Sequence, residues 1–234
     1  ALSLIEDLKR APEIKLCGML THFAQPSDTD FTKEQRKRFL EVIEQAKLDR
    51  DPSFLVHADN SSSLRSLENN TVFNAVRIGV LQFGIASPRG SLLADLRVEP
   101  VLSFHSKLAM VKELPKGTSL SYDRQYTLDR DSKIGIISAG YGDAIPLHCG
   151  NRSNGLIQGR SYPLVGRVTM DQTLIDLTDS NTEFELGENV TLVGKQGNQE
   201  ILLSTLAEDA GTIPWELLCS ITKRVPRIYK TKRE

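Results

Sequence analysis

The sequence is poor in cysteine: its 234 residues include only Cys17, Cys149 and Cys219. Their number is odd and they lie far apart, whereas a disulfide framework needs cysteines in pairs. Disulfides also persist mainly in oxidising compartments. We therefore expect a chain without disulfides that works in the reducing environment of the cytoplasm.

The sequence also has almost no net charge, because 29 Lys and Arg residues are balanced by 30 Asp and Glu residues, leaving −1. Proteins that bind nucleic acids or membrane surfaces carry basic patches or segments. No apolar run approaches the roughly 18 residues of a membrane span, and we expect no signal peptide before the fold. Nucleic acid and membrane are therefore not expected as partners.

Several catalytic motifs are missing as well. The four histidines and three cysteines have no close ligand spacing, so we expect no zinc or other metal site. Gly140-Tyr-Gly-Asp143 is too short, and too far from a strand–helix unit, to be a phosphate loop. No serine lies in a nucleophile elbow, and nothing near Cys149 would lower the pKa of its thiol.

The first hundred residues instead alternate between strand and helix patterns. Apolar residues at helical spacing predict a helix over residues 1–10, which Pro12 ends, and residues 14–20 predict a buried strand. A second helix is predicted from an N-cap at Thr32 with Gln35 three residues later. Its apolar stripe contains Phe39, Leu40, Ile43 and Ala46.

Residues 53–57 and 74–80 predict two further strands, with a short helix between them that turns Leu64 and Leu67 inward. Each strand ends in polar residues: Thr21-His22-Phe23, Asp59-Asn60-Ser61 and Arg77-Ile78-Gly79. Parallel strands need helical crossovers, and α/β barrels carry their chemistry at the carboxyl ends of the strands. Three strands cannot close an eight-stranded barrel. We therefore expect residues 1–96 to be the last part of a TIM-type (β/α)8 barrel.

Three of these polar positions have two interpretations. His22 is either a structural histidine beside a strand or a catalytic one. Asn60-Ser61 is either a helix N-cap or a phosphate-binding turn, and the two uses can coexist. Arg77 lies in an apolar strand, and a buried charge must be paired or functional.

The pattern changes near Pro100, and residues 97–234 predict a second, mainly β domain with short turns between its strands. Two short helices are predicted near its end, over residues 203–210 and 214–222. Strands are predicted over residues 101–110, 119–128, 134–139, 155–158, 162–168, 173–177, 189–192 and 224–229.

One predicted strand of this domain, Ser119-Leu-Ser-Tyr122-Asp-Arg-Gln-Tyr126, carries two tyrosines four residues apart. Two other polar segments of the domain are Gly140-Tyr141-Gly142-Asp143 and Met170-Asp171-Gln172. We expect the polar segments of both halves to converge on one site, with Tyr122 as its acid/base. The residue patterns alone give an α/β part, a β part and a polar site, without a reaction.

The polar segments, taken in order, resemble alanine racemase, a pyridoxal-phosphate enzyme of fold type III. The order and approximate spacing match over nearly the whole chain. The resemblance lies in Gly18-Met-Leu-Thr-His22-Phe-Ala, Ala58-Asp-Asn60-Ser61, Val76-Arg77-Ile-Gly79-Val80, Leu120-Ser-Tyr122, Gly140-Tyr141-Gly-Asp143, Gly166-Arg167-Val-Thr-Met170-Asp171-Gln172, Trp215-Glu-Leu-Leu and Arg224-Val-Pro-Arg227.

The resemblance implies a role for each site residue. Tyr122 is similar to the tyrosine that takes or gives the α-proton on one face of the substrate, and His22 to the histidine that orients it. Arg77 resembles the arginine beside the pyridine nitrogen. The remaining implied contacts are Asn60, Ser61, Gly79, Val80 and Trp215 to the cofactor phosphate, Met170 and Asp171 to the substrate carboxylate, and Tyr141 to the access corridor.

The implied protein is a homodimer that interconverts L-alanine and D-alanine for peptidoglycan precursors, with each site shared between subunits. Tyrosine has a reference pKa near 10, so a hydrogen bond from His22 and a nearby Arg77 would favour its anion. An arginine that keeps its proton would leave the pyridine nitrogen unprotonated. It would thereby weaken the cofactor as an electron sink and limit side reactions such as transamination.

Departures from the family pattern leave alternatives open. The lysine that binds the cofactor, in a Lys-Ala-Asn-Ala-Tyr-Gly-like motif, has no counterpart, and the sequence opens on Ala-Leu-Ser-Leu as if inside a helix. We therefore expect a C-terminal part of a longer enzyme, inactive alone. Trp215 replaces a tyrosine, Leu147 a basic residue and Asp123 a glycine. The alternatives are a serine or broad-specificity racemase and a non-catalytic module.

Overall fold

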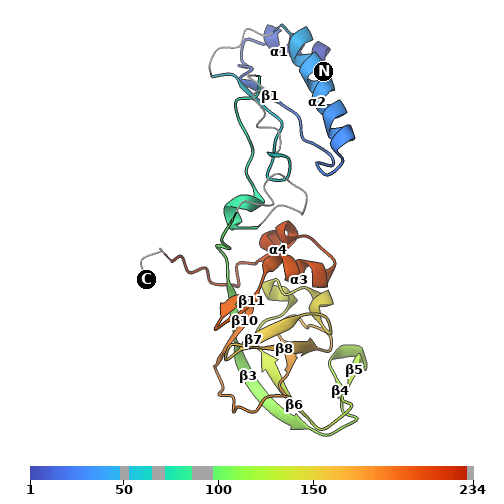
Figure 1. The fold of residues 1–234 in the computed structure, drawn as a ribbon, viewed down its shortest axis with the longest axis vertical. Coiled ribbons are helices and arrows are strands. Elements are labelled where there is room, and N and C mark those ends of the chain that lie inside the picture. The colour runs from blue at the N-terminus through green and yellow to red at the C-terminus, as the bar shows by residue number, and fades with distance from the viewer. Residues whose placement is uncertain (48–52, 65–71, 86–96, 231–234) are drawn as a thin grey trace. The chain divides into compact units, whose positions relative to one another are not determined.

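The computed structural model describes residues 1–47, 53–64, 72–85 and 97–230 (Figure 1). By its internal contacts the chain divides into two compact units, Ala1–Glu99 and Pro100–Glu234. The boundary that the sequence placed at residue 97 lies close to this division. Among the described residues, no helix has both the length and the apolar character that a membrane span requires.

The first unit is built from helices and a small parallel sheet. Its elements are α1 (Leu2–Arg10), β1 (Gly18–Leu20), α2 (Thr29–Gln45), β2 (Leu55–His57) and the 3₁₀ turn η2 (Val80–Phe83). β1 and β2 pair in parallel, in a register that sets Met19 opposite Val56. The strands predicted over residues 14–20 and 53–57 thus form over shorter ranges. The α/β character of this half is confirmed.

The predicted N-cap of α2 was wrong. The helix begins after Asp28, whose carboxylate accepts the Phe31 N–H at 3.0 Å, while the Thr32 hydroxyl donates to the Gln25 carbonyl. Aspartate caps a helix at least as well as threonine, and here it lies one turn earlier. Gln35 does not complete a capping box: its amide donates to Thr21 Oγ1 at 3.1 Å.

The third predicted strand, residues 74–80, does not form as a regular strand. Only an isolated parallel bridge joins Arg77 to Asn60. The side chain of Asn74 accepts the Val56 N–H and donates to the Phe54 carbonyl, both at 2.8 Å. In a regular sheet, backbone groups of a neighbouring strand would make these hydrogen bonds. The segment still runs beside β2 and brings Arg77 to the end of that strand. The companion prediction for Leu67 lies outside the described residues.

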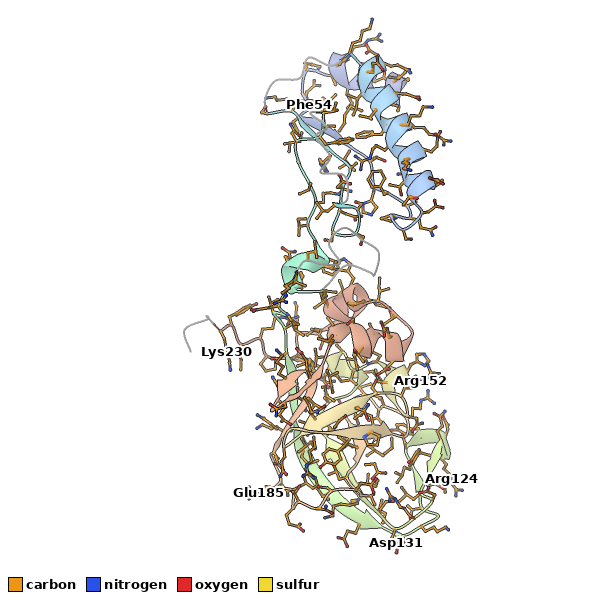
Figure 2. The ribbon with its side chains drawn as sticks, viewed as in Figure 1. Phe54, Arg124, Asp131, Arg152, Glu185 and Lys230 are labelled. Atoms are coloured by element: carbon orange, nitrogen blue, oxygen red, sulfur yellow. The ribbon has the colours of Figure 1, made fainter. Side chains whose placement is uncertain are left out.

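The core of the first unit contains Phe39 and Ile43 from α2 with Phe54 and Val56 from around β2 (Phe54 is labelled in Figure 2). This confirms the apolar stripe predicted for α2. Beside the core, Arg36 pairs with Asp59 at 3.0 Å, and the two side chains are only 18% and 6% exposed. The Arg36 guanidinium also lies 5.0 Å from the ring centroids of Phe23 and Phe73.

Replacing Arg36 with methionine is expected to destabilise the first unit by about 3 kcal/mol, because it leaves the buried Asp59 carboxylate without this partner. Urea unfolding would measure the change. The matched control is Arg38→Met, which breaks the exposed pair with Glu34 on the same helix. That pair is expected to contribute about 0.5 kcal/mol or less. Equal losses in the two variants would contradict the prediction.

The second unit is an antiparallel β structure that closes on itself. Its sheet order is β11-β10-β3-β6-β9-β8-β7, and β10 also pairs with β7 through Thr191 and Leu156. Closure removes free edges, which are sites of unwanted pairing. The strands are β3 (Phe104–Leu114), β6 (Ser132–Ile137), β7 (Asn154–Ile157), β8 (Arg160–Val165), β9 (Thr173–Asp176), β10 (Asn189–Gln196) and β11 (Gln199–Ile201).

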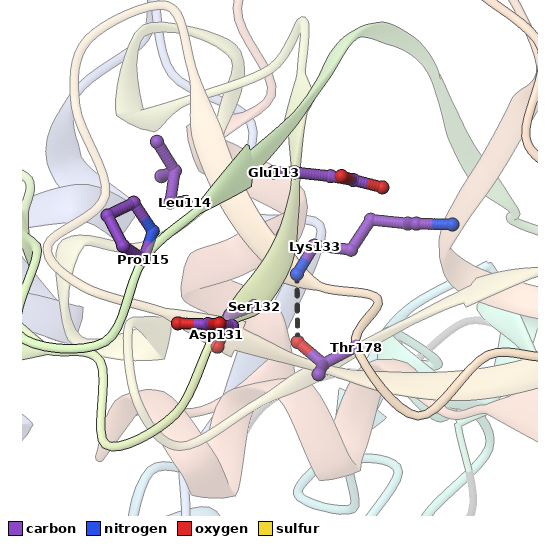
Figure 3. Close-up of a pocket in the computed structure, with 7 residues that line it drawn as sticks. All are labelled: Glu113, Leu114, Pro115, Asp131, Ser132, Lys133 and Thr178. Atoms are coloured by element: carbon purple, nitrogen blue, oxygen red, sulfur yellow. Dashed lines mark hydrogen bonds between the residues drawn. The ribbon is translucent and has the colours of Figure 1, made fainter.

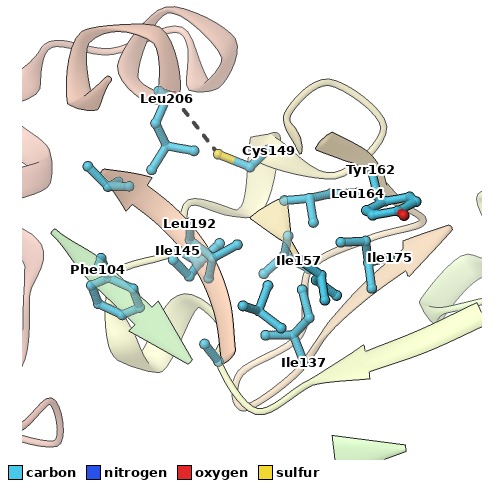
Figure 4. Packing of buried hydrophobic residues seen from close by; sticks show 14 of the residues in the cluster. Phe104, Ile137, Ile145, Cys149, Ile157, Tyr162, Leu164, Ile175, Leu192 and Leu206 are labelled. Atoms are coloured by element: carbon cyan, nitrogen blue, oxygen red, sulfur yellow. Dashed lines mark hydrogen bonds between the residues drawn. The ribbon is translucent and has the colours of Figure 1, made fainter. Parts of the chain in front are cut away.

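The core of this unit lies between the sheet and the helices α3 (Leu203–Ala210) and α4 (Pro214–Ser220) (Figure 4). The sequence predicted α3 at these residues and α4 two residues longer. Cys149 lies fully buried in the core, and burial raises the pKa of its thiol. A buried thiol with a raised pKa is a poor nucleophile.

Two predicted strands of the second unit were wrong. Residues 119–128 form a short hairpin, β4 (Ser119–Leu120) and β5 (Tyr126–Thr127), around the 3₁₀ turn η4 (Tyr122–Arg124). Residues 224–229 form no strand. Pro226 has no N–H to donate, and the Arg227 guanidinium bonds instead to the carbonyls of Ile221 and Thr222. β10 runs to Gln196, four residues beyond the strand predicted over residues 189–192, and β11 was not predicted.

Candidate functional site

In the first unit, Arg77 is the centre of a hydrogen-bond network. Its Nη1 lies 2.7 Å from His57 Nδ1 and its Nη2 lies 3.0 Å from His22 Nδ1. Nη2 also donates to the carbonyls of Thr21 at 3.2 Å and Ala58 at 3.0 Å. The carbonyl ends of β1 and β2 therefore meet on one guanidinium. Among the described residues, its hydrogen-bond partners are imidazoles and carbonyls.

Arginine only donates, so each Nδ1 is the acceptor in its contact with Arg77. The pKa of His57 lies below its usual 6.5, first because of burial and then because of the Arg77 charge. Neutral His57 therefore favours the folded state fully above pH 6.5, and this contribution falls as pH drops below 6.5. His57 was not among the predicted site residues, although it ends β2 much as His22 follows β1.

His22 is exposed, and its second ring nitrogen faces away from Arg77. In the neutral ring Nδ1 accepts from Arg77, so Nε2 carries the proton. Nε2 lies 3.5 Å from Asn60 Nδ2, which is the outer limit for a hydrogen bond. In this tautomer both nitrogens are donors, so neither can accept from the other. The Nε2–H is thus oriented to donate to a further acceptor. Gln35 holds the backbone here by donating to the His22 carbonyl at 2.7 Å.

Asn60, Ser61 and Gly79 form a compact turn at the end of β2. Asn60 Oδ1 accepts the Ser62 N–H at 2.9 Å, as in a cap, and Ser61 Oγ accepts the Gly79 N–H at 2.8 Å. Val80 follows as the first residue of η2, where backbone N–H groups point outward. The Ser61 hydroxyl hydrogen and the Val80 N–H are donors that suit a phosphate dianion, whereas the Gly79 N–H is engaged by Ser61 Oγ in this structure. Both sequence interpretations of Asn60-Ser61 therefore fit the geometry.

In the second unit, the segment of Tyr141 packs on the segment of Met170. The Tyr141 N–H donates to the Thr169 carbonyl and the Gly142 N–H to the Met170 carbonyl, both at 2.9 Å. Gly140 permits this approach, because a Cβ there would overlap the Thr169 carbonyl oxygen. The side chains of Tyr141 and Met170 are about half exposed. The two polar segments thus form one surface.

Arg224, which the sequence analysis gave no role, joins the same two segments by ion pairs. Its Nε lies 3.3 Å from Asp143 Oδ1 and its Nη2 lies 2.5 Å from Asp171 Oδ1. The pKa of Arg224 is raised, first by the hydrogen bond to Asp171 and then by the charge of Asp143. Thr222 adds a hydrogen bond to the Gly142 carbonyl at 2.9 Å. Asp171 therefore has a cationic partner within the unit.

Tyr122 stands in the turn between β4 and β5, with 68% of its surface exposed. The hairpin is anchored by a small core that includes Leu120, Leu128 and Val165. Arg124, labelled in Figure 2, lies in the same turn. Trp215 occupies the first turn of α4 and is partly exposed.

The predicted site residues thus form separate groups. His22, Asn60, Ser61, Arg77, Gly79 and Val80 belong to the first unit, and Tyr122, Tyr141, Met170, Asp171 and Trp215 belong to the second. Within each unit the structure brings distant segments together, except that Tyr122 and Trp215 stand on elements of their own. Across the described ranges, no group of three or more His, Cys, Asp or Glu side chains could hold a metal ion.

A pocket of about 370 Å³ lies elsewhere in the second unit, where β3 ends and β6 begins (Figure 3). Lys133 lines it and its backbone N–H donates to the Thr178 hydroxyl at 3.1 Å. No predicted site residue is in its lining, which consists of Glu113, Leu114, Pro115, Asp131, Ser132, Lys133 and Thr178. The candidate site residues therefore lie outside this pocket.

Two family models match the sequence. Residues 1–87 match the model of the alanine racemase N-terminal domain, and residues 101–229 match that of the alanine racemase C-terminal domain. Together the two matches cover both units.

Individual proteins match in the same way. The alanine racemase of Halothermothrix orenii is 34% identical over 99% of this chain and 61% of its own length. That of Thermodesulfovibrio yellowstonii is 35% identical over 98% and 60%. The chain thus spans about 60% of the length of these curated relatives.

Solved structures of the same family superpose well. A Bacillus anthracis alanine racemase with bound L-Ala-P has a TM-score of 0.84 at 32% identity, covering 98% of this chain and 59% of that one. The alanine racemase of Streptomyces coelicolor has a TM-score of 0.87 at 30% identity, with coverages of 99% and 61%.

Proposed function

The chain belongs to the alanine racemase family, and from that premise we propose that the full-length protein interconverts L-alanine and D-alanine with pyridoxal 5'-phosphate. The observation that carries the proposal is the network around Arg77, which joins the ends of β1 and β2 to His22. The product would supply peptidoglycan precursors in the cytoplasm. The first unit is proposed to be the last part of a TIM-type barrel.

The residues of the first unit fit the cofactor. The Ser61 hydroxyl, the Asn60 amide and the backbone N–H of Val80 would hold its phosphate, and the Gly79 N–H would join them by turning from Ser61 Oγ, which it now contacts, to the phosphate. Arg77 would face the pyridine nitrogen. When bound, the cofactor withdraws electrons from the substrate α-carbon and so makes its hydrogen acidic. Arg77 keeps its own proton and would limit this withdrawal, which favours return of the proton over side reactions.

Tyr122 is the proposed acid/base on one face of the substrate. Its phenol would take the α-proton or give one back, and the His22 Nε2–H would donate to the phenolate oxygen. We propose that the protein is a homodimer in which each site combines the Arg77 network of one subunit with Tyr122 of the partner subunit. Met170 and Tyr141 would then meet the substrate from that side, and Trp215 would contribute to the phosphate site.

Asp171 has a more limited role in this proposal. Its carboxylate pairs with Arg224 at 2.5 Å, and a carboxylate repels the carboxylate of an amino acid. We propose that it positions Met170, whose neighbouring backbone meets the substrate. This refines the contact that the family resemblance implies for Asp171.

The test is racemisation by the full-length protein loaded with pyridoxal phosphate, measured separately on L-alanine, L-serine and L-lysine. We expect L-alanine to have the highest kcat/KM. A higher value for L-serine would support a serine racemase, an alternative that the departures Trp215 and Leu147 favour. Loaded protein that racemises none of the three would overturn the proposal and leave a non-catalytic module.

Replacing Arg224 with glutamine is expected to lower kcat/KM for L-alanine about tenfold, because Asp143 and Asp171 lose their shared cation and the Tyr141 and Met170 segments separate. Arg224 is half exposed, so the unfolding free energy should change by less than about 1 kcal/mol. Steady-state kinetics and thermal unfolding would measure both. The matched control is Arg227→Gln in the segment after α4, since the Arg227 guanidinium donates to the nearby carbonyls of Ile221 and Thr222.

A further inference from the structure

The backbone on both sides of Tyr122 adopts conformations that L-residues rarely take. Ser121 has φ 67° and ψ 179°, a region that is almost confined to glycine, and Asp123 has φ 59° and ψ 11°. Arg124 follows at φ 51°. Such residues persist only where surrounding contacts hold them, and they gather at functional sites. The contacts around this turn must therefore stabilise it.

The ends of the turn are held by its own hairpin. β4 and β5 pair through Leu120 and Tyr126, and the Arg124 guanidinium donates to Ser119 Oγ at 3.0 Å. These contacts lie within the hairpin itself. They do not connect Tyr122 to the rest of the candidate site.

The turn is joined to a distant segment at Arg167. Ser121 Oγ donates to the Arg167 carbonyl at 2.6 Å, and the Arg167 guanidinium pairs with the Asp123 carboxylate. Gly166 allows this approach: it has φ 70°, and a Cβ there would lie 2.9 Å from Ser121 Cβ. Both strained residues beside Tyr122 are therefore held by one residue, through its backbone and its side chain.

We propose that Asp123 is a positioning residue for the reaction. Together, the Asp123–Arg167 ion pair and the Ser121–Arg167 hydrogen bond form a latch. The latch holds the backbone of Tyr122 against the segment that leads to Met170. Asp123 touches no reacting atom and acts through Tyr122. The inference rests on the proposed function, in which Tyr122 exchanges the α-proton.

Two consequences follow from the position of the latch. A proton-transferring atom that drifts by a fraction of an ångström slows the chemical step more than it weakens binding, so kcat should change and KM should not. The two side chains of the ion pair are 64% and 36% exposed, so salt should screen the pair. Turnover of the wild-type protein should therefore fall as ionic strength rises.

The kinetic test uses the full-length protein with pyridoxal phosphate bound. Asp123→Asn tolerates the left-handed backbone and removes only the charge, and Arg167→Gln removes the partner. We expect each to lower kcat for L-alanine about tenfold with KM within twofold, and the double variant to be no worse than either. Asp123→Glu, which restores a carboxylate, should recover part of kcat. Additive losses in the double variant would overturn the latch.

The matched control is Asp179→Asn, which breaks the exposed Arg130–Asp179 pair of the same unit. Its kcat should stay within twofold of the wild type at every salt concentration. A loss equal to that of Asp123→Asn would mean a general effect of surface charge and would overturn the proposal.

A second readout does not depend on activity. In protein labelled with 3-fluorotyrosine, the fluorine resonance of residue 122, assigned through Tyr122→Phe, should be single in the wild type. In Asp123→Asn it should broaden or split, and in Asp179→Asn it should not. If loaded wild-type protein racemises nothing, the proposed function fails while this readout still decides whether the latch exists. An unchanged resonance in Asp123→Asn would overturn the latch.

Discussion

Tyr122→Phe in the full-length protein is expected to lower the rate of alanine racemisation by about 10²–10⁴-fold, the usual contribution of a positioned general acid or base. Phenylalanine keeps the ring and removes only the hydroxyl. Tyr122 is 68% exposed and lies outside the main core, so stability should hardly change. Steady-state kinetics on L-alanine and D-alanine would measure the loss.

Exchange of the α-hydrogen with deuterated water refines this prediction. If Tyr122 serves one face of the substrate, its loss should slow exchange from one enantiomer more than from the other. Tyr126→Phe is the matched control, because Tyr126 is in the same hairpin but packs against the small core, where burial raises its pKa. Near-normal turnover in Tyr122→Phe would contradict the role assigned to this tyrosine.

Replacing Arg77 with glutamine should lower racemisation by about 10²-fold or more, because two carbonyls and two imidazoles lose a charged donor at once. Each charge-assisted hydrogen bond contributes about 1.5–3 kcal/mol. The His22 ring would lose the contact that sets its tautomer, and His57 would lose its 2.7 Å partner. The remaining turnover should contain a larger share of transamination, since no fixed cation would face the pyridine nitrogen.

Kinetics and detection of pyruvate would measure both effects, and the visible spectrum would report whether the cofactor is still bound. Arg38→Gln is the control, an exposed arginine of the same unit that pairs only with Glu34. A variant that binds the cofactor and racemises alanine at the wild-type rate would exclude the network as the basis of the proposed activity.

Local patterns predicted the four α-helices α1 to α4, with errors at the start of α2 and the end of α4. The period of Phe39 and Ile43 placed the buried face of α2, and the residues of α3 were predicted without error. His22 and Arg77 drew attention because charged or titratable residues at the end of apolar strands need partners. Such inferences depend on residues that are close in the sequence, and they can therefore be made from one sequence alone.

The parts that the sequence did not predict depend on partners far apart in the chain. Arg224 meets Asp171 across 53 positions and Ser121 meets Arg167 across 46, and no local period marks either pair. The strand predicted through Tyr122 was wrong. Its apolar-polar alternation is typical of a strand, but the segment contains a turn that Arg167, distant in the sequence, contacts at Ser121 and Asp123. The strand predicted over residues 74–80 was wrong for a similar reason, because the Asn74 side chain, rather than backbone groups, bonds to Phe54 and Val56.

The closure of the second unit has a consequence for how the chain folds. β3 pairs with β10 in a register that joins Lys107 to Asn189, so this pair of the sheet joins segments that lie far apart in the chain. Pairing across such a separation carries a high entropic cost and slows folding. During synthesis, β3 emerges from the ribosome long before its neighbour exists. In that interval it presents an open strand edge, and chains held close together, as on a polysome, would be exposed to mispairing there.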